Sequence, residues 1–262
     1  PDGRVIVLTY RCCAIDGPNF HSAALFRYIS ADGGQTFDAG AIIGTTDMDD
    51  AAFGPGDAVT TIGTGPSYTG AQAAPLAAFN DVEAQLAPGV IGVNKTIAVT
   101  GAQTVAAIGD GRTFTVGVAN GDPSATASWA FGPSANGGDL ALAAGPKGTF
   151  LLVLSGRRYV LRRIDTTKAR LGRTLVLTGR SFPIFGTASA DAGGRIHAAW
   201  VQGRALRYRR TSKSATRLEG THKLVTGSGF FDLSVGAGAN GRGWVAWDSN
   251  GPNKTVRAIV TP

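Results

Sequence analysis

Short apolar segments separated by turn residues recur along the whole chain. Six of them share one pattern, a Gly/Pro/Asp turn followed by a strand of alternating residues: PDGRVIVLT from Pro1, GPGDAVTTIG from Gly54, IGDGRTFTVG from Ile108, AGPKGTFLLVL from Ala144, ADAGGRIHAAW from Ala190 and GANGRGWVAW from Gly238. Five are preceded by a run of small residues: DDAAF, TVAAI, LALAA, GTASA and LSVGA. Alternation with period two is typical of β-strands, so the pattern predicts an all-β chain.

The spacing of the repeats predicts the architecture. The glycines of the six turns are separated by 37 to 55 residues, and they are Gly3, Gly56, Gly111, Gly148, Gly194 and Gly241. Units of this length with four strands each are typical of a β-propeller. We therefore expect a single six-bladed propeller domain with blades at 1–46, 47–101, 102–137, 138–182, 183–227 and 228–262.

The unit 183–227 shows the expected order of strands within a blade. GTASADA is the inner strand, because small side chains suit the crowded axis, and RIHAAWV, ALRYRRTS and HKLVT follow it outward. In the third strand, Leu206 and Tyr208 should face one side and Arg207 and Arg209 the other. The unit 102–137 is short, and we expect it to lack a regular fourth strand.

The two ends of the repeat pattern are incomplete. The first unit begins at its turn, without an inner strand, and the last unit ends with its third strand. We expect an N-terminally trimmed propeller, in which roughly 15–25 upstream residues would supply both missing strands. A partner chain or a seventh blade would fill the same gap.

The segment SADGGQTF, Ser30 to Phe37, follows the expected third strand of the first unit. Its order Ser-x-Asp-x-Gly-x-Thr-aromatic resembles the Asp box of sialidase-like (BNR-repeat) propellers. The resemblance implies a structural role for Ser30, Asp32, Gly34, Thr36 and Phe37: the Asp accepts hydrogen bonds from the turn, and the aromatic packs under the hairpin. The arginine triad, the Tyr–Glu pair and the acid Asp of sialidases have no matching motifs here.

Charge and composition add further expectations. The net charge is +7, and residues 151–225 hold 16 Lys and Arg against 3 Asp and Glu. One basic side can attract an anionic polymer, although a solvated outer strand surface is the simpler interpretation. Lys is rare beside Arg, Ala and Gly, which suggests a bacterial source. We expect an exported protein, secreted or periplasmic, without a membrane span. Cys12 and Cys13 are the only cysteines, and they could form either a vicinal disulfide or two free thiols.

Candidate chemistry gathers in the loops expected on the face opposite the Asp box. The first of these loops, RCCAIDGPNFHS, is the longest. Aromatic rings stack on sugars, while Asp, Asn and Arg bind hydroxyl groups. The candidate ligand-binding residues on this face are Tyr10, Arg11, Asp16, His21, Asp49, Trp200, Arg204, Trp247 and Asp248. Trp200 and Trp247 could instead belong to the core between blades, which is the simpler interpretation.

These residues leave several functions open. We expect a non-catalytic protein that binds a glycan or cell-surface polymer. A glycoside hydrolase would need two carboxylates about 5–10 Å apart, such as Asp16 with Asp49 or Asp248, and a protein-interaction scaffold would use the basic strands. We expect no cofactor, no specific nucleic-acid partner and no metal, because the acidic run DMDD lacks the spacing of a calcium loop. The catalytic residues, the ligand and the oligomeric state stay open.

Overall fold

The computed structural model describes residues 5–16, 19–32, 36–44, 50–53, 59–62, 94–123, 126–180, 182–238, 241–249 and 255–262. The described part is all-β, with one short 3-10 turn at Thr126–Ser128 and no α-helix. It therefore contains no helix long and apolar enough to cross a membrane.

The strands form six antiparallel sheets, and four of these are propeller blades. Blade I contains β6 (Asn94–Thr100), β7 (Gln103–Gly109), β8 (Thr113–Asn120), β9 (Trp129–Phe131) and β10 (Ala135–Asn136). Blade II contains β11 (Gly138–Gly145), β12 (Gly148–Ser155), β13 (Arg158–Asp165) and β14 (Arg170–Val176). Blade III contains β15 (Ile184–Ala190), β16 (Ile196–Gln202), β17 (Ala205–Arg210) and β18 (His222–Thr226). Blade IV contains β19 (Phe230–Ala237), β20 (Gly243–Ser249) and β21 (Thr255–Val260).

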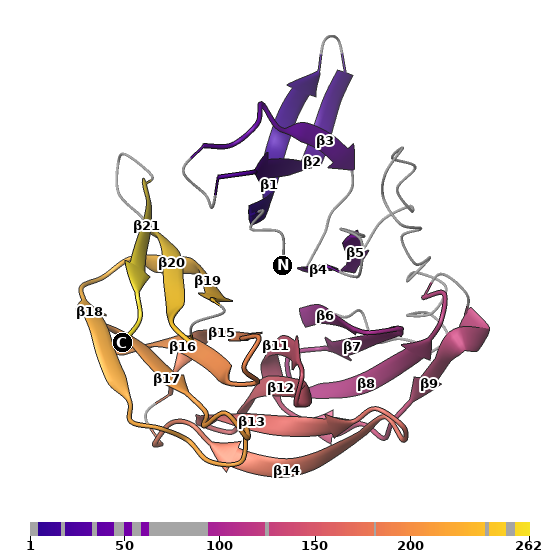
Figure 1. Cartoon of the computed structure of the whole chain (residues 1–262), viewed down its shortest axis with the longest axis vertical. Coiled ribbons are helices and arrows are strands. Elements are labelled where there is room, and N and C mark those ends of the chain that lie inside the picture. The colour runs from indigo at the N-terminus through magenta and orange to yellow at the C-terminus, as the bar shows by residue number, and fades with distance from the viewer. Residues whose placement is uncertain are drawn as a thin grey trace.

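The other two sheets come from the N-terminal part of the chain. One contains β1 (Val5–Asp16), β2 (Asn19–Ser30) and β3 (Ala41–Gly44), and the other contains β4 (Asp50–Phe53) and β5 (Val59–Ile62). Figure 1 shows blades I to IV following one another around an arc, with the inner strands β6, β11, β15 and β19 toward its centre and β14 and β18 on the outside. The β1–β3 sheet stands apart from this arc.

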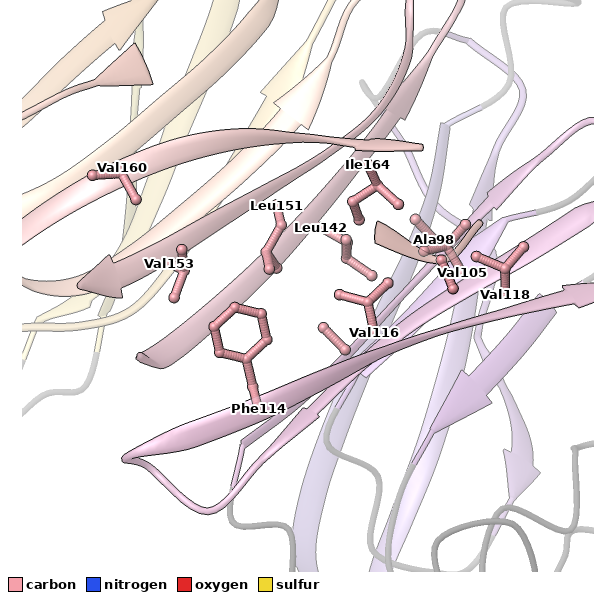
Figure 2. Close-up of a cluster of buried hydrophobic side chains, with 12 residues drawn as sticks. Ala98, Val105, Phe114, Val116, Val118, Leu142, Leu151, Val153, Val160 and Ile164 are labelled. Carbon is pink, nitrogen blue, oxygen red and sulfur yellow. The ribbon is translucent and has the colours of Figure 1, made fainter. Parts of the chain in front are cut away.

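The blades are held together by apolar clusters between neighbouring sheets. Because successive strand residues point to opposite faces, Leu151 and Val153 of β12 pack toward blade I, whereas Phe150 and Leu152 pack toward blade III. Figure 2 shows the cluster between blades I and II, where Phe114 and Val116 meet Leu151 and Val153. A third cluster joins blades III and IV, and Ile62 of β5 packs against blade I.

Polar side chains link the inner strands of neighbouring sheets. The carboxylate of Asp50 in β4 accepts hydrogen bonds from the Thr96 hydroxyl at 2.6 Å and the Ile97 amide at 2.9 Å, both in β6. The Thr96 hydroxyl oxygen in turn accepts a bond from the Leu142 amide of β11 at 3.0 Å. These bonds use backbone donors that strands in separate sheets would otherwise leave without partners.

The structure confirms the all-β propeller and corrects the number of blades. Six were predicted, whereas the described residues form four, because a sequence repeat specifies a local sheet without specifying how it packs on its neighbours. The predicted inner strand TVAAI of the third unit lies in β7, the second strand of blade I; the inner strand is β6, from the preceding unit. The outer position of blade I is occupied by the two short strands β9 and β10, which pair with β8.

The predicted turns are confirmed where the structure describes them. Gly111, Gly148, Gly194 and Gly241 have φ values of 88°, 108°, 89° and 77°, a conformation that favours glycine. The prediction that RCCAIDGPNFHS forms a long loop is wrong. Its residues extend a hairpin in which β1 runs to Asp16 and β2 begins at Asn19, with Arg11 opposite Ala24 and Ala14 opposite His21.

Candidate functional site

The end of the connection from β14 to β15 and the first two residues of β15 carry a group of exposed apolar side chains. Phe182, Ile184 and Phe185 are 56%, 42% and 41% exposed, and we call these three residues the apolar ledge. Ile184 lies opposite Val201, so the ledge is at the same end of blade III as the turn between β16 and β17. That end belongs to the loop face on which the sequence placed the ligand site.

The backbone of the ledge is held in a conformation that costs energy. Phe182 and Phe185 have φ values of 42° and 53°, which bulky residues rarely adopt. Phe185 lies where the β15–β16 register shifts between Ile184 and Thr187. Strained, exposed aromatic residues of this kind are concentrated at functional sites, and the sequence signal that could have revealed them is the apolar run FPIF within a loop.

A carboxylate of the neighbouring blade anchors the strand that follows the ledge. The Gly186 amide donates to Asp139 of β11 at 3.2 Å and to the Tyr159 hydroxyl at 2.6 Å, and the Tyr159 hydroxyl also donates to Asp139 in a very short bond. Burial, together with the nearby Asp139 charge, raises the pKa of Tyr159 far above its ordinary value. Tyr159 therefore stays a neutral donor that fixes the entry to β15.

A pocket of about 470 Å³ lies beside the start of the same connection. Its lining includes Leu177 and Thr178 from the connection, Trp200 and Gln202 from β16, Arg207 from β17, and Thr221. Trp200 and Arg207 are directly opposite each other on adjacent strands. We call this the Trp200–Arg207 pocket, and it lies between blades II and III because Trp200 packs with Tyr159, Leu161 and Leu177.

Two hydrogen-bond donors of residues that line this pocket have no acceptor among the described residues. They are the indole Nε1 of Trp200 and the Nε of Arg207, and both atoms are shielded from solvent. Arg209, on the same side of β17, instead donates to the backbone oxygens of Leu177 at 2.9 Å and Glu219 at 2.7 Å. This contact confirms that the Arg207/Arg209 side faces blade II, whereas Leu206 and Tyr208 face blade IV.

The remaining predicted residues of blades III and IV have different environments. Trp247 is buried between blades III and IV and meets Phe230 edge to face at 6.1 Å, so it belongs to the core as the simpler interpretation held. Trp200, also buried, has a core position and in addition lines the pocket. Arg204 is exposed in the turn beside the pocket, and Asp248 is half-buried in β20.

The other predicted ligand residues lie in a different sheet. Tyr10, Arg11 and Asp16 belong to β1 and His21 to β2, so the structure assigns them to strands of the β1–β3 sheet, which Figure 1 shows apart from blade III. Cys12 and Cys13 also lie in β1. Asp49 lies outside the described residues.

The described residues of the Asp-box segment, 30–32 and 36–37, include a set of hydrogen bonds to Asp32. Both carboxylate oxygens of Asp32 lie 3.0 Å from the Thr36 amide, and Asp32 also accepts bonds from the hydroxyls of Thr36 at 2.6 Å and Ser30 at 2.7 Å. Phe37, which the resemblance placed under the hairpin, is instead 42% exposed. Gly34 lies outside the described residues.

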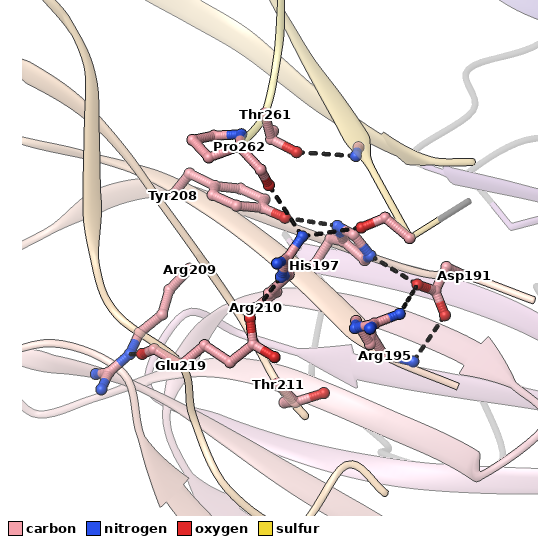
Figure 3. A network of polar contacts seen from close by, with 12 residues as sticks. Asp191, Arg195, His197, Tyr208, Arg209, Arg210, Thr211, Glu219, Thr261 and Pro262 are labelled. Carbon is pink, nitrogen blue, oxygen red and sulfur yellow. Dashed lines mark hydrogen bonds and ion pairs between the residues drawn. The ribbon is translucent and has the colours of Figure 1, made fainter. Parts of the chain in front are cut away.

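A buried polar chain crosses from blade III toward blade IV, as Figure 3 shows. Asp191 Oδ2 lies 3.2 Å from His197 Nε2, and His197 Nδ1 lies 2.7 Å from the Tyr208 hydroxyl. Burial lowers the pKa of His197, with Asp191 opposing the shift. Burial alone would raise the pKa of Asp191, but the hydrogen bonds from the Arg195 amide and from His197 outweigh it, so the pKa is lowered. All three side chains are inaccessible, so this chain is structural.

The described residues offer little support for hydrolytic chemistry. Wherever a carboxyl pKa is shifted, at Asp110, Asp165 and Asp191, the shift is downward, whereas a general acid needs an upward shift. In the same part of the chain, no three His, Cys, Asp or Glu residues cluster to hold a metal. Asp50, from the acidic run, is engaged with β6.

Two similar solved structures with TM-scores above 0.5 agree with the fold. Similar solved structures include AofleA from Arthrobotrys oligospora, with a TM-score of 0.62 at 10% identity over 93% of this chain and 78% of that one. Hydrazine synthase of Kuenenia stuttgartiensis has a TM-score of 0.54 at 14% identity over 82% and 63%. The α-L-arabinofuranosidase PaAbf62A of Podospora anserina in complex with cellotriose has a TM-score of 0.45 at 9% identity over 64% and 63%.

These structural similarities show the fold alone. The chain spans less than two thirds of the hydrazine synthase and arabinofuranosidase chains. No protein-family model and no curated protein matches the sequence. The chain has a β-propeller fold, and its resemblance to sialidase-like propellers rests on the SADGGQTF segment and, more weakly, on the repeat pattern of the whole chain.

Proposed function

We propose that this propeller binds a glycan or cell-surface polymer through the apolar ledge and acts without catalysing a reaction. The observation that carries the proposal is the exposure of Phe182, Ile184 and Phe185 on the loop face. Flat aromatic rings held rigidly in solvent suit the apolar faces of sugar rings, because stacking removes apolar surface from water without ordering a flexible side chain. An exported location, as the sequence suggests, would give the ledge access to such polymers.

The geometry of the site favours binding over hydrolysis. Asp139, the carboxylate that accepts a bond from β15 directly after the ledge, is engaged with the Tyr159 hydroxyl and the Gly186 amide. A carboxylate committed to two donors is poorly suited to serve as nucleophile or base. Its position instead explains how the strained ledge keeps one conformation.

A glycan array with the full chain, followed by calorimetric titration of the best ligand, tests this proposal. The decisive variant is F182N/F185N, because Asn tolerates positive φ and the change removes both rings without adding backbone strain. We expect the double variant to keep its fold and to lose at least tenfold in affinity. Phe37→Asn is the matched control, since Phe37 is equally exposed but lies in the Asp-box hairpin. Absence of wild-type binding, or equal binding by the double variant, would contradict the proposal.

A further inference from the structure

We propose that the Trp200–Arg207 pocket is a subsite for a carboxylate, so that the ligand of this protein is a glycan carrying uronic-acid or other carboxylate-bearing sugars. This inference rests on the proposed function for its ligand class. The pocket itself is defined independently of the apolar ledge, by residues of β16, β17 and the β14–β15 connection.

The charge of Arg207 is the first argument. In the part of the chain that the structure describes, Arg207 has no acidic partner, whereas Arg195 pairs with Asp191 at 3.5 Å and Arg210 with Glu219 at 2.6 Å. Among the residues lining the pocket, none is acidic. A half-buried guanidinium without a counter-charge is costly, and a carboxylate is the group whose planar geometry matches the guanidinium fork.

The indole of Trp200 supplies the second argument. Trp200 is 1% exposed, and its Nε1–H, a donor only, has no acceptor in the part of the chain that the structure describes. A buried donor without a partner costs about 1–3 kcal/mol. Since Trp200 and Arg207 are cross-strand neighbours, one anion that enters the pocket with a small rotation of the two side chains can accept from both.

The surroundings of the pocket supply the third argument. Lys223 lies opposite Arg207 on β18, Arg204 is exposed in the adjoining turn, and Arg180 is exposed in the β14–β15 connection. The two nearest acidic residues by sequence, Asp191 and Glu219, are committed to Arg195, His197 and Arg210. The local field therefore attracts anions to the pocket and disfavours cations.

The pocket is tested directly with galacturonate, and galactose serves as its neutral counterpart. In ¹⁵N-labelled protein, the indole N–H resonance of Trp200 is assigned by its disappearance in Trp200→Phe. We expect galacturonate to shift this resonance in a saturable way and galactose to leave it unchanged. Arg207→Gln should abolish the shift, whereas Arg173→Gln, which removes an exposed charge from blade II, should preserve it. No saturable shift, or an equal shift in Arg207→Gln, would overturn the inference.

Oligosaccharides separate this inference from the proposed function. Oligogalacturonate and the same oligosaccharide after reduction of its carboxyl groups are titrated into wild type, Arg207→Gln and F182N/F185N. We expect Arg207→Gln to lose tenfold or more in affinity for the acidic form only, and F182N/F185N to lose affinity for both forms. If wild type and Arg207→Gln each bind the acidic and the reduced oligosaccharide with the same affinity, the carboxylate subsite is wrong, but the proposed role of the ledge is unaffected. If galacturonate shifts the Trp200 resonance but F182N/F185N binds both oligosaccharides as tightly as wild type, the carboxylate subsite is supported and the proposed role of the ledge is wrong.

Discussion

The hydroxyl of Tyr208 lies 2.7 Å from Nδ1 of His197, and both side chains are completely buried. The opposite ring nitrogen, Nε2, faces the Asp191 carboxylate at 3.2 Å. A carboxylate can only accept, so Nε2 carries the proton and Nδ1 accepts from the Tyr208 hydroxyl. Every polar group of this chain thus has a partner while the imidazole is neutral.

Removing the Tyr208 hydroxyl should destabilise the propeller without changing its shape. Tyr208→Phe keeps the ring in the cluster between blades III and IV but leaves His197 Nδ1 without a donor. We expect a loss of about 1–3 kcal/mol in the free energy of unfolding, measured by urea denaturation. Ser155→Ala, which removes an exposed hydroxyl at the end of β12, should change it by less than about 0.5 kcal/mol.

The stability of the protein should fall in mildly acidic solution because of His197. Its pKa in the folded state lies below the ordinary value of 6.5, so the unfolded chain binds the proton more readily. The stabilisation that depends on neutral His197 is therefore complete above pH 6.5 and is lost as the pH falls toward the folded-state pKa. We expect the melting temperature to fall as the pH is lowered below 6.5. A His197→Gln variant should be less stable at neutral pH, and its melting temperature should depend less on pH. If the melting temperature of the variant depends on pH as strongly as that of wild type, His197 is not the group responsible.

The charge of Asp139 should be important for the entry into β15. Asp139→Asn tolerates the positive φ of 51° at this position but weakens the bonds from Gly186 and Tyr159. We expect a cost of about 1–2 kcal/mol and faster hydrogen exchange of the Gly186 amide. Exchange of the Leu177 amide, which bonds to the Tyr159 backbone oxygen, serves as the internal reference and should change little.

Gly186 should not tolerate a side chain. A Cβ at this position would lie 2.5 Å from Cζ of the buried Tyr159 ring, so Gly186→Ala forces that ring out of place. Overpacking of this kind costs about 1–3 kcal/mol. Gly220→Ala, where a Cβ would meet nothing within 4 Å, should leave the unfolding midpoint nearly unchanged. If both variants were equally stable, the close packing of β15 on Tyr159 would be wrong.

Asp32 should stabilise its hairpin and play no part in ligand binding. Asp32→Ala removes the acceptor for the Thr36 amide and for the Thr36 and Ser30 hydroxyls. We expect faster exchange of the Thr36 amide, with ligand affinity within twofold of wild type. A large loss of affinity would instead assign this turn to the binding site.

The sequence predicted the features that depend on local pattern. The alternation in RIHAAWV and ALRYRR defined β16, β17 and the two sides of each strand, and the turn glycines follow from the need for positive φ. Packing between sheets depends on residues that are far apart in the sequence, so local pattern does not predict it. The sequence of RCCAIDGPNFHS has no regular alternation, yet its pairing with the following strand makes it part of a long hairpin.

The candidate site could be predicted only in part. Trp200 and Arg204 were identified because Trp and Arg near the end of a strand are informative residue types. Arg207 was assigned to a blade side, but its lack of a counter-charge depends on which acceptors Arg209 and Arg210 take. Phe182 and Phe185 were missed, since an apolar residue in a loop is usually buried and only the fold shows that these are not.

The clusters between the blades have a consequence for how the molecule unfolds. Blades II and III each contribute side chains to two clusters, so neither can open without disrupting a neighbour on both sides. Blade IV contributes to one described cluster only, so the stability of the arc should decrease from its middle toward β21, as in repeat proteins with nearest-neighbour coupling. The ledge and the Trp200–Arg207 pocket lie at the junction of blades II and III, each of which packs against a neighbour on both sides, so we expect this surface to fluctuate less than β21 does.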